Sequence, residues 1–197
     1  AIDSRIIIKI KKDNEPDSIK TTEGQHLQRL QETSAIQGIQ RQIYYSQNYY
    51  TELGIAKMIT DLNLKVSIPE EKLDSKISSI EKKTGIVLDE MQRLAVAKSA
   101  GSGVLIITGG PGTGKTTTIN ALISYFEAEG RRIALCAPTG RAAKRMTEAT
   151  GCEARTIHRL LEFKPPEGYK RNEENPLEGD VLIIDECSMV DTVLMNS

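Results

Sequence analysis

The chain has 197 residues, of which 39% are hydrophobic and 27% are charged, and its formal net charge at pH 7 is −1. This composition is typical of a globular protein, and the near-zero charge excludes a global basic field for nucleic acid, although charge can still be segregated. No apolar run reaches the roughly 18 residues of a membrane span, and the N-terminus lacks a secretory pattern. Its three cysteines are far apart, as in reduced cytosolic proteins. We therefore expect a cytoplasmic protein with no membrane partner.

The first third of the chain is predicted to be a small, mostly helical element with a linker, spanning residues 1–66. Residues 6–10 have the apolar pattern of a short strand, and residues 49–64 have apolar side chains near helical spacing. The next helix is predicted from Pro69 to Gly85, because acids follow its start and lysines precede the glycine. A further helix is predicted over residues 89–100, with Asp89 as its N-cap.

Three short apolar runs follow, at residues 103–110, 131–139 and 179–186, and helical stretches separate them. Continuous apolar strands that alternate with helices indicate a parallel sheet covered on both faces. Residues 67–197 are therefore predicted to form an α/β nucleotide-binding domain. Residues 164–176 are charged and contain prolines, which predicts an exposed loop.

The segment "GGPGTGKT", residues 109–116, fits the phosphate-binding pattern G-x-x-x-x-G-K-[ST] and lies between a predicted strand and a predicted helix. Its glycines let backbone amides turn toward phosphates, and the helix N-terminus adds partial positive charge. Lys115 is predicted to reach the β and γ phosphates of a nucleotide, and Thr116 to offer its hydroxyl to Mg²⁺. The nucleotide-binding residues predicted here are Gly110, Pro111, Gly112, Thr113, Gly114, Lys115, Thr116 and Thr117.

Two adjacent carboxylates, Asp185 and Glu186, end the last apolar run. In an enzyme with this phosphate loop, a carboxylate at the position of Asp185 orients Mg²⁺ or its water. Glu186 can then act as general base on the attacking water, which favours an enzyme with turnover over a slow switch.

Three further features narrow the class of enzyme. Gln92 lies on the helix before the phosphate loop, and its amide suits the N6 and N7 atoms of adenine, although taken alone it is more simply interpreted as an exposed helical glutamine. The segment "APTGRAAKRM", residues 137–146, offers small residues and cations after the second run. The segment "TIHRLL", residues 156–161, places a threonine at a helix start.

Taken in order, Gln92, "GGPGTGKTT", "APTGRAAKRM", "TIHRLL" and "LIIDECSMVD" resemble motifs Q, I, Ia, Ib and II of superfamily 1 DNA helicases. The resemblance is to the RecD-like branch, which includes free-standing bacterial helicases and the exonuclease V alpha subunit, and it covers roughly residues 85–195. It implies a RecA-like fold and ATP-driven movement, five-prime to three-prime, on single-stranded DNA in recombination and repair.

Residue by residue, the resemblance implies that Gln92 binds adenine, that Lys115 contacts the phosphates, and that Thr116 and Asp185 hold the magnesium ion. Glu186 would activate the water. It implies partners among the exonuclease V subunits or a single-strand-binding protein, with ATP and Mg²⁺ as cofactors. The DNA contacts that it implies are Pro138, Thr139, Gly140, Arg141, Thr156 and His158. Residues 131–171 carry ten lysines and arginines against four acids, a local net charge of about +6, which is compatible with a phosphate-binding face.

Several alternatives stay open. The motors of this family use two RecA-like domains, so the resemblance implies a first domain truncated after motif II, which at most binds nucleotide. A second hypothesis is an ATPase subunit that regulates a nuclease or conjugative relaxase complex without unwinding DNA by itself. A GTPase is less favoured because no N-K-x-D motif is present. The paired tyrosines at residues 44–45 and 49–50 suit packing against the motor domain or stacking on bases.

Overall fold

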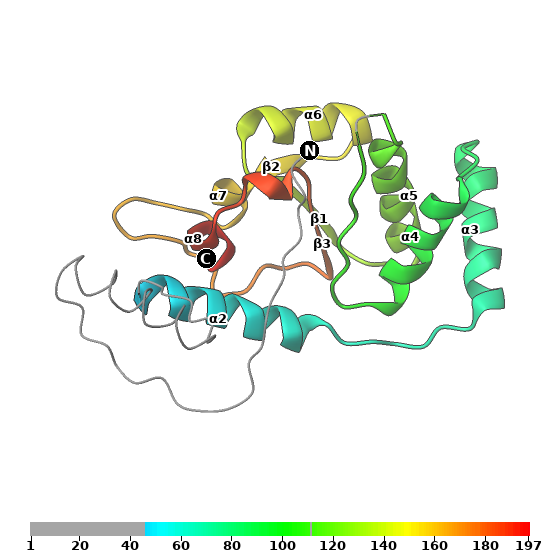
Figure 1. Cartoon of the computed structure of the whole chain (residues 1–197). Coiled ribbons are helices and arrows are strands. Elements are labelled where there is room, and N and C mark those ends of the chain that lie inside the picture. The colour runs from blue at the N-terminus through cyan, green and yellow to red at the C-terminus, as the bar shows by residue number, and fades with distance from the viewer. Residues whose placement is uncertain (1–45, 111) are drawn as a thin grey trace, which may run out of the picture. The chain divides into compact units, whose positions relative to one another are not determined.

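The structure, a computed structural model, describes residues 46–110 and 112–197. The chain divides into two units, residues 1–50 and 51–197, and nearly all of the described residues belong to the second (Figure 1). The strand expected at residues 6–10 and the tyrosines at 44–45 lie outside the described residues. The expected boundary between residues 66 and 67 stays a prediction.

The described chain alternates helices with short strands after a helical start (Figure 1). None of the described helices is long and apolar enough to cross a membrane. The elements are α2 (Ser46–Leu62), α3 (Glu70–Thr84), α4 (Glu90–Gly101), α5 (Lys115–Ala128), β1 (Ile133–Ala137), α6 (Gly140–Thr150), β2 (Ala154–Thr156), α7 (Ile157–Leu160), β3 (Val181–Ile184), the 3-10 helix η1 (Cys187–Met189) and α8 (Thr192–Met195).

Local signals in the sequence set the bounds of α3 and α4. Helix α3 ends at Gly85, whose φ of 71° is left-handed and whose N–H donates to the carbonyl of Glu81. Helix α4 begins with a capping box, in which Asp89 and Gln92 each accept a hydrogen bond from the other's backbone N–H. Both helices lie where the sequence predicts them.

The sheet is parallel and has the order β2-β1-β3. Ala137 of β1 pairs with Thr156 of β2, and Cys136 pairs with Ile184 of β3. Two of the three apolar runs of the sequence therefore form strands, and the α/β class with a parallel sheet is confirmed. Since all three strands run the same way, their carboxyl ends meet at one edge.

The first apolar run does not form the strand that we expected at residues 103–110. Residues 104–110 have no regular secondary structure, and Ile106 is 70% exposed. A strand requires a hydrogen-bonded neighbour, and the described sheet contains only β1, β2 and β3. The run is apolar, as expected, but its composition does not specify which segment of the chain it would pair with.

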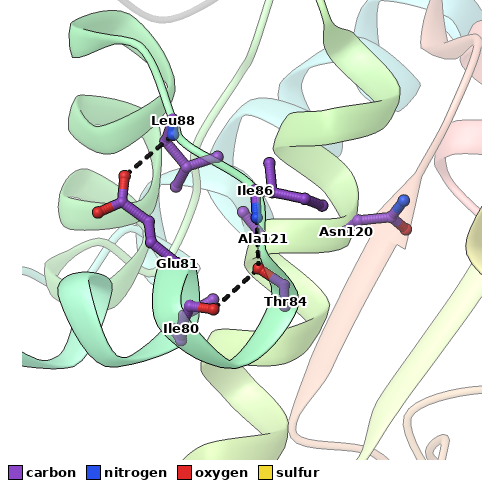
Figure 2. Close-up of a pocket in the computed structure, with 7 residues that line it drawn as sticks. All are labelled: Ile80, Glu81, Thr84, Ile86, Leu88, Asn120 and Ala121. Carbon is purple, nitrogen blue, oxygen red and sulfur yellow. Dashed lines mark hydrogen bonds between the residues drawn. The ribbon is translucent and has the colours of Figure 1, made fainter.

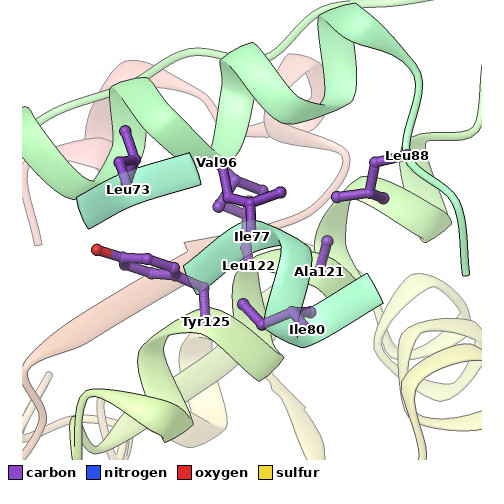
Figure 3. Packing of buried hydrophobic residues seen from close by; sticks show 8 residues of the cluster. All are labelled: Leu73, Ile77, Ile80, Leu88, Val96, Ala121, Leu122 and Tyr125. Atoms are coloured by element: carbon purple, nitrogen blue, oxygen red, sulfur yellow. The ribbon is translucent and has the colours of Figure 1, made fainter. Parts of the chain in front are cut away.

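Helices α3, α4 and α5 enclose the main hydrophobic core of the described residues (Figure 3). Its most buried members are Ile77 of α3 and Val96 of α4, with 1% and 0% of their surface exposed. A second cluster contains Ile123 of α5, Leu135 of β1 and Met146 of α6. Ile183 of β3 packs against both clusters, so the sheet is held against the helices.

Replacing Ile77 with alanine is expected to lower the free energy of unfolding by about 2–5 kcal/mol, because the truncation leaves a cavity among three helices. Chemical denaturation followed by circular dichroism measures this loss. Val87→Ala is the control, since Val87 is 87% exposed and its truncation should change stability by less than about 0.5 kcal/mol. Equal effects of the two substitutions would contradict the packing described here.

Candidate functional site

The phosphate loop turns directly into helix α5. Lys115 is the first residue of α5, and its Nζ donates to the carbonyl oxygens of Gly109 and Gly110, at 2.7 and 2.8 Å. The Thr113 hydroxyl also donates to the Gly110 carbonyl. The ammonium group therefore lies over the mouth of the loop, where a phosphate would meet it together with the N–H groups of the helix start. Pro111 lies outside the described residues.

Gln92 lies against the last glycine of the loop. Its Oε1 accepts from the backbone N–H of Asp89 at 3.0 Å. Its Nε2 is so close to Gly114 that a Cβ built there would lie 2.4 Å from it. An amide carbonyl has a second lone pair, so Gln92 can still accept one bond and donate another to a base edge. The structure thus brings together Gln92 and Gly114 of the phosphate loop, which are 22 positions apart in the sequence.

Replacing Gly114 with alanine is expected to disturb the loop more than backbone strain alone explains. Gly114 has a φ of 73°, which costs an L-residue about 1–2 kcal/mol, and the added Cβ would also displace the Gln92 amide. Gly130→Ala is the matched control, because Gly130 has a φ of 70° with nothing within 4 Å of its built Cβ. We expect the unfolding free energy of Gly114→Ala to fall further than that of the control. Equal losses would mean that Gln92 moves aside freely.

The carboxyl edge of the sheet gathers the other predicted site residues. Asp185 follows β3, and its N–H donates to the carbonyl of Cys136 at 3.0 Å, one step before the end of β1. Pro138 and Thr139 follow β1, and Thr156 ends β2 level with Ala137. Helix α5 packs on β1 and joins it through residues 129–132, so α5 runs back along the strand. Its first turn, with the phosphate loop, therefore points toward the same edge (Figure 1).

The two carboxylates differ in their surroundings. Asp185 is half-buried, and its Oδ1 accepts from the backbone N–H of Glu186 at 2.9 Å. Glu186 is exposed and has a left-handed φ of 54°, which is uncommon for a residue other than glycine. Strained backbone of this kind tends to occur at functional sites. The carboxylate of Glu186 is thus accessible to a water molecule, whereas that of Asp185 is fixed beside the sheet.

The residues predicted for magnesium suit that ion. Thr116 is exposed in the first turn of α5, with Thr117 half-buried beside it. The described residues contain no group of three or more histidine, cysteine or acidic side chains able to hold a metal by itself. Mg²⁺ does not require such a cage, because it usually takes one or two protein oxygens together with phosphates and several waters. A threonine hydroxyl and one carboxylate are the oxygen donors that such a site uses.

The threonines predicted to contact DNA are helix caps in the structure. Thr139 Oγ1 accepts from the N–H of Ala142 at the start of α6, and Thr156 Oγ1 accepts from that of Arg159 at the start of α7. A hydroxyl that accepts still has its own proton to donate to a phosphate oxygen. Gly140 and Arg141 are exposed beside Thr139. The structure therefore leaves all of these groups accessible along the carboxyl edge.

An aromatic cluster surrounds His158. Its ring lies 5.6 Å from that of Phe163 and 6.0 Å from that of Tyr169, and the latter two rings are 4.8 Å apart. The cluster borders an open hollow of about 280 Å³, whose lining includes Arg159 and Lys164. Phe163 and Tyr169 did not figure in the sequence analysis. Their signal was the placement of two aromatic residues on either side of the proline-containing turn at 164–168.

Part of the basic segment is neutralised by local ion pairs. Arg132 pairs with Asp180, Lys144 with Glu148, Arg155 with Glu153, and Arg171 with Glu162. Within residues 46–110 and 112–197, the other six cations of this segment form no ion pair: Arg131, Arg141, Arg145, Arg159, Lys164 and Lys170. Arg141 lies two positions after Thr139, and Arg159 and Lys164 line the hollow beside His158, so part of the positive charge that remains for a ligand lies at these two places.

A small pocket lies away from the phosphate loop, between α3, α5 and the α3–α4 connection (Figure 2). Its volume of about 20 Å³ holds roughly one water molecule, so it is too small for a nucleotide. Glu81 on its wall accepts from the N–H of Leu88 and from Arg93, and these two contacts hold the pKa of Glu81 below its usual range. This carboxylate is therefore charged at neutral pH.

Comparisons with known proteins agree with this geometry. A family model described as an AAA domain matches residues 92–197. The ATP-dependent RecD2 DNA helicase of Deinococcus radiodurans is 44% identical over 119 residues, which cover 60% of this chain and 16% of that protein. The RecBCD enzyme subunits RecD of Mycobacterium tuberculosis and Haemophilus influenzae are 39% and 36% identical over 127 and 151 residues, covering 53% and 64% of this chain. The matches span 22% and 23% of those two subunits.

Proposed function

The chain belongs to the AAA domain family and is a RecD-like member of it, and we propose that it is the ATP-binding part of a DNA helicase. The observation that carries the proposal is the pairing of two groups at one site. The ammonium of Lys115 lies over the phosphate loop, and the amide nitrogen of Gln92 lies against Gly114 of the same loop. The ammonium of Lys115 suits a triphosphate, and the amide of Gln92 suits the edge of an adenine base.

In the proposed reaction, Lys115 and the N–H groups at the start of α5 hold the β and γ phosphates. Thr116 and Asp185 would hold Mg²⁺, which would neutralise negative charge on the phosphate oxygens when bound. Glu186 accepts a proton from the attacking water. Its exposed position at the carboxyl edge of the sheet supports this role, because the phosphate loop points toward that edge.

We further propose that single-stranded DNA runs along the carboxyl edge, past the ends of β1 and β2. The hydroxyls of Thr139 and Thr156 and the backbone at Gly140 would donate to phosphates, and Arg141 would add charge. Pro138 shapes the turn between β1 and α6. The aromatic cluster of His158, Phe163 and Tyr169 offers exposed ring surface beside unpaired cations, a combination that favours unpaired bases.

This proposal is tested by measuring ATP hydrolysis by the full-length helicase with and without single-stranded DNA. We expect DNA to stimulate hydrolysis, and we expect duplexes with a five-prime overhang to be unwound in preference to those with a three-prime overhang. If the rate of ATP hydrolysis is the same with and without DNA, and no duplex is unwound, the alternative of a regulatory ATPase in a nuclease or relaxase complex would be favoured. A cytoplasmic location and association with other exonuclease V subunits or with a single-strand-binding protein belong to the same proposal.

Replacing Phe163 with alanine is expected to weaken the binding of single-stranded DNA by about 5- to 100-fold, because stacking contributes about 1–3 kcal/mol per base. Fluorescence anisotropy with a labelled oligothymidine measures the change. Val193→Ala is the control, since Val193 is exposed on α8 and is no part of the proposed DNA path. If Phe163→Ala binds single-stranded DNA with unchanged affinity, the aromatic cluster is not part of the DNA path.

A further inference from the structure

A side chain outside the phosphate loop fixes the helix that carries Gln92. Glu81 belongs to α3 and is only 16% exposed. Its Oε1 accepts from the backbone N–H of Leu88 at 2.9 Å, and its Oε2 accepts from Arg93 Nη1 at 2.6 Å. Figure 2 shows the first of these bonds crossing from α3 to the connection that leads into α4.

Arg93 is the residue after Gln92, and α3 holds it at two points. Besides its contact with Glu81, its guanidinium lies 3.8 Å from the carboxylate of Asp74. Asp74 and Glu81 are seven positions apart, so they lie on the same side of α3. A charged pair with such a short contact restrains a helix more strongly than a neutral hydrogen bond does. The first turn of α4 is therefore tied to α3 on both sides of Gln92, through Leu88 and through Arg93.

The same turn fixes the direction of the Gln92 side chain. Its Oε1 is held by the N–H of Asp89, and this bond leaves Nε2 directed at Gly114. If the connection at residues 85–89 shifted, the donor at Asp89 would shift with it. The amide would then lose its orientation relative to the loop, even though Lys115 and the loop carbonyls stayed in place. The position of Gln92 thus depends on the anchoring of Leu88 and Arg93.

We propose that Glu81 is a positioning residue for recognition of the nucleotide base, acting through Gln92. This rests on the proposed function, in which Gln92 contacts adenine. Glu81 itself touches no nucleotide. It makes the binding of ATP more selective over GTP because it holds the two ends of the turn from which Gln92 projects, whereas the contacts to the phosphates do not depend on it.

The chain provides a matched control on the same helix. Lys76 of α3 forms an ion pair with Glu129, which follows the last residue of α5. Like the Glu81–Arg93 pair, it ties α3 to a neighbouring helix. Its residues lie at the end of α5 opposite to the phosphate loop. Glu129→Gln therefore removes a comparable charge and a comparable tie between helices without touching the turn that carries Gln92.

The test is to measure the dissociation constants of ATP and of GTP for the full chain, for Glu81→Gln, for Gln92→Ala and for Glu129→Gln. We expect the unsubstituted chain to prefer ATP. In Glu81→Gln, ATP binding should weaken by about 3- to 10-fold, the scale of one hydrogen bond, while GTP binding changes less than about twofold. Glu129→Gln should keep the original ratio. Because both dissociation constants are measured on the same sample, a loss of folded protein does not alter the ratio of ATP affinity to GTP affinity.

A double substitution separates positioning from general structural support. If Glu81 acts through Gln92, then adding Glu81→Gln to Gln92→Ala should leave the ATP-to-GTP ratio where Gln92→Ala alone puts it. The positioning role would be overturned if the double variant changed the ratio further. It would also be overturned if Glu81→Gln weakened the binding of ATP and of GTP equally. Either result would leave the proposed function intact. A chain that binds neither nucleotide would instead contradict the proposed function itself.

Discussion

Replacing Lys115 with alanine is expected to weaken ATP binding by at least about 30-fold. The substitution removes the cation that would pair with the β and γ phosphates, and truncating one partner of a charged, hydrogen-bonded pair costs about 2–5 kcal/mol. It also leaves the carbonyls of Gly109 and Gly110 without the donor that joins them in the structure. Isothermal titration of the full chain with Mg²⁺ and ATP measures the loss.

The control for this substitution is Lys82→Ala, since Lys82 is an exposed lysine in the last turn of α3. It changes the net charge by the same amount and should leave ATP binding within about twofold. In the full-length helicase, hydrolysis stimulated by single-stranded DNA should disappear in Lys115→Ala and persist in the control. Persistent stimulation in Lys115→Ala would defeat the helicase proposal, because no second phosphate-binding lysine is proposed.

Glu186→Gln is expected to slow ATP hydrolysis by the full-length helicase by about 10²- to 10⁴-fold, which is the usual contribution of a general base. ATP binding should change less than about threefold, since Glu186 is not assigned to the phosphates or to the magnesium ion. Glutamate and glutamine share the same backbone requirement at a φ of 54°, so the substitution tests the carboxylate rather than the strain. Single-turnover kinetics separate the chemical step from product release.

Glu178→Gln is the companion control, because Glu178 is exposed and lies before β3 rather than after it. Its hydrolysis rate should match that of the unsubstituted enzyme. If Glu186→Gln hydrolyses ATP at the original rate, another group activates the water. If it fails to bind ATP at all, Glu186 has a role in holding the nucleotide or the loop, which would contradict the assignment made here.

Features that depend on neighbouring residues were predictable from the sequence. The capping box of α4 and the left-handed glycine that ends α3 are formed by residues within one turn of each other, so their residue types suffice to place them. The phosphate loop is predictable for the same reason. Strands β1 and β3 were also found, because each is a continuous apolar run that ends in polar residues.

Features that depend on distant partners were not predictable from a single sequence. Nothing in the residues around Glu81 indicates that it reaches Leu88 and Arg93, seven and twelve positions away. The Gln92 amide was predicted to bind adenine, but its approach to Gly114 was not predicted. The segment at 104–107 has the composition of a strand, yet whether it pairs depends on which chain segment lies beside it.

That unpaired segment has a consequence for how the protein must be handled. Residues 104–107 expose Ile106 and Ile107, and among the described residues β3 is an edge strand with Leu182 exposed. A short, uncharged run rich in β-branched residues is the kind of sequence that pairs with copies of itself, and an open sheet edge offers a second place for such pairing. Concentrated samples of this chain are thus prone to self-association through these two segments, so the measurements described above are best made on dilute protein.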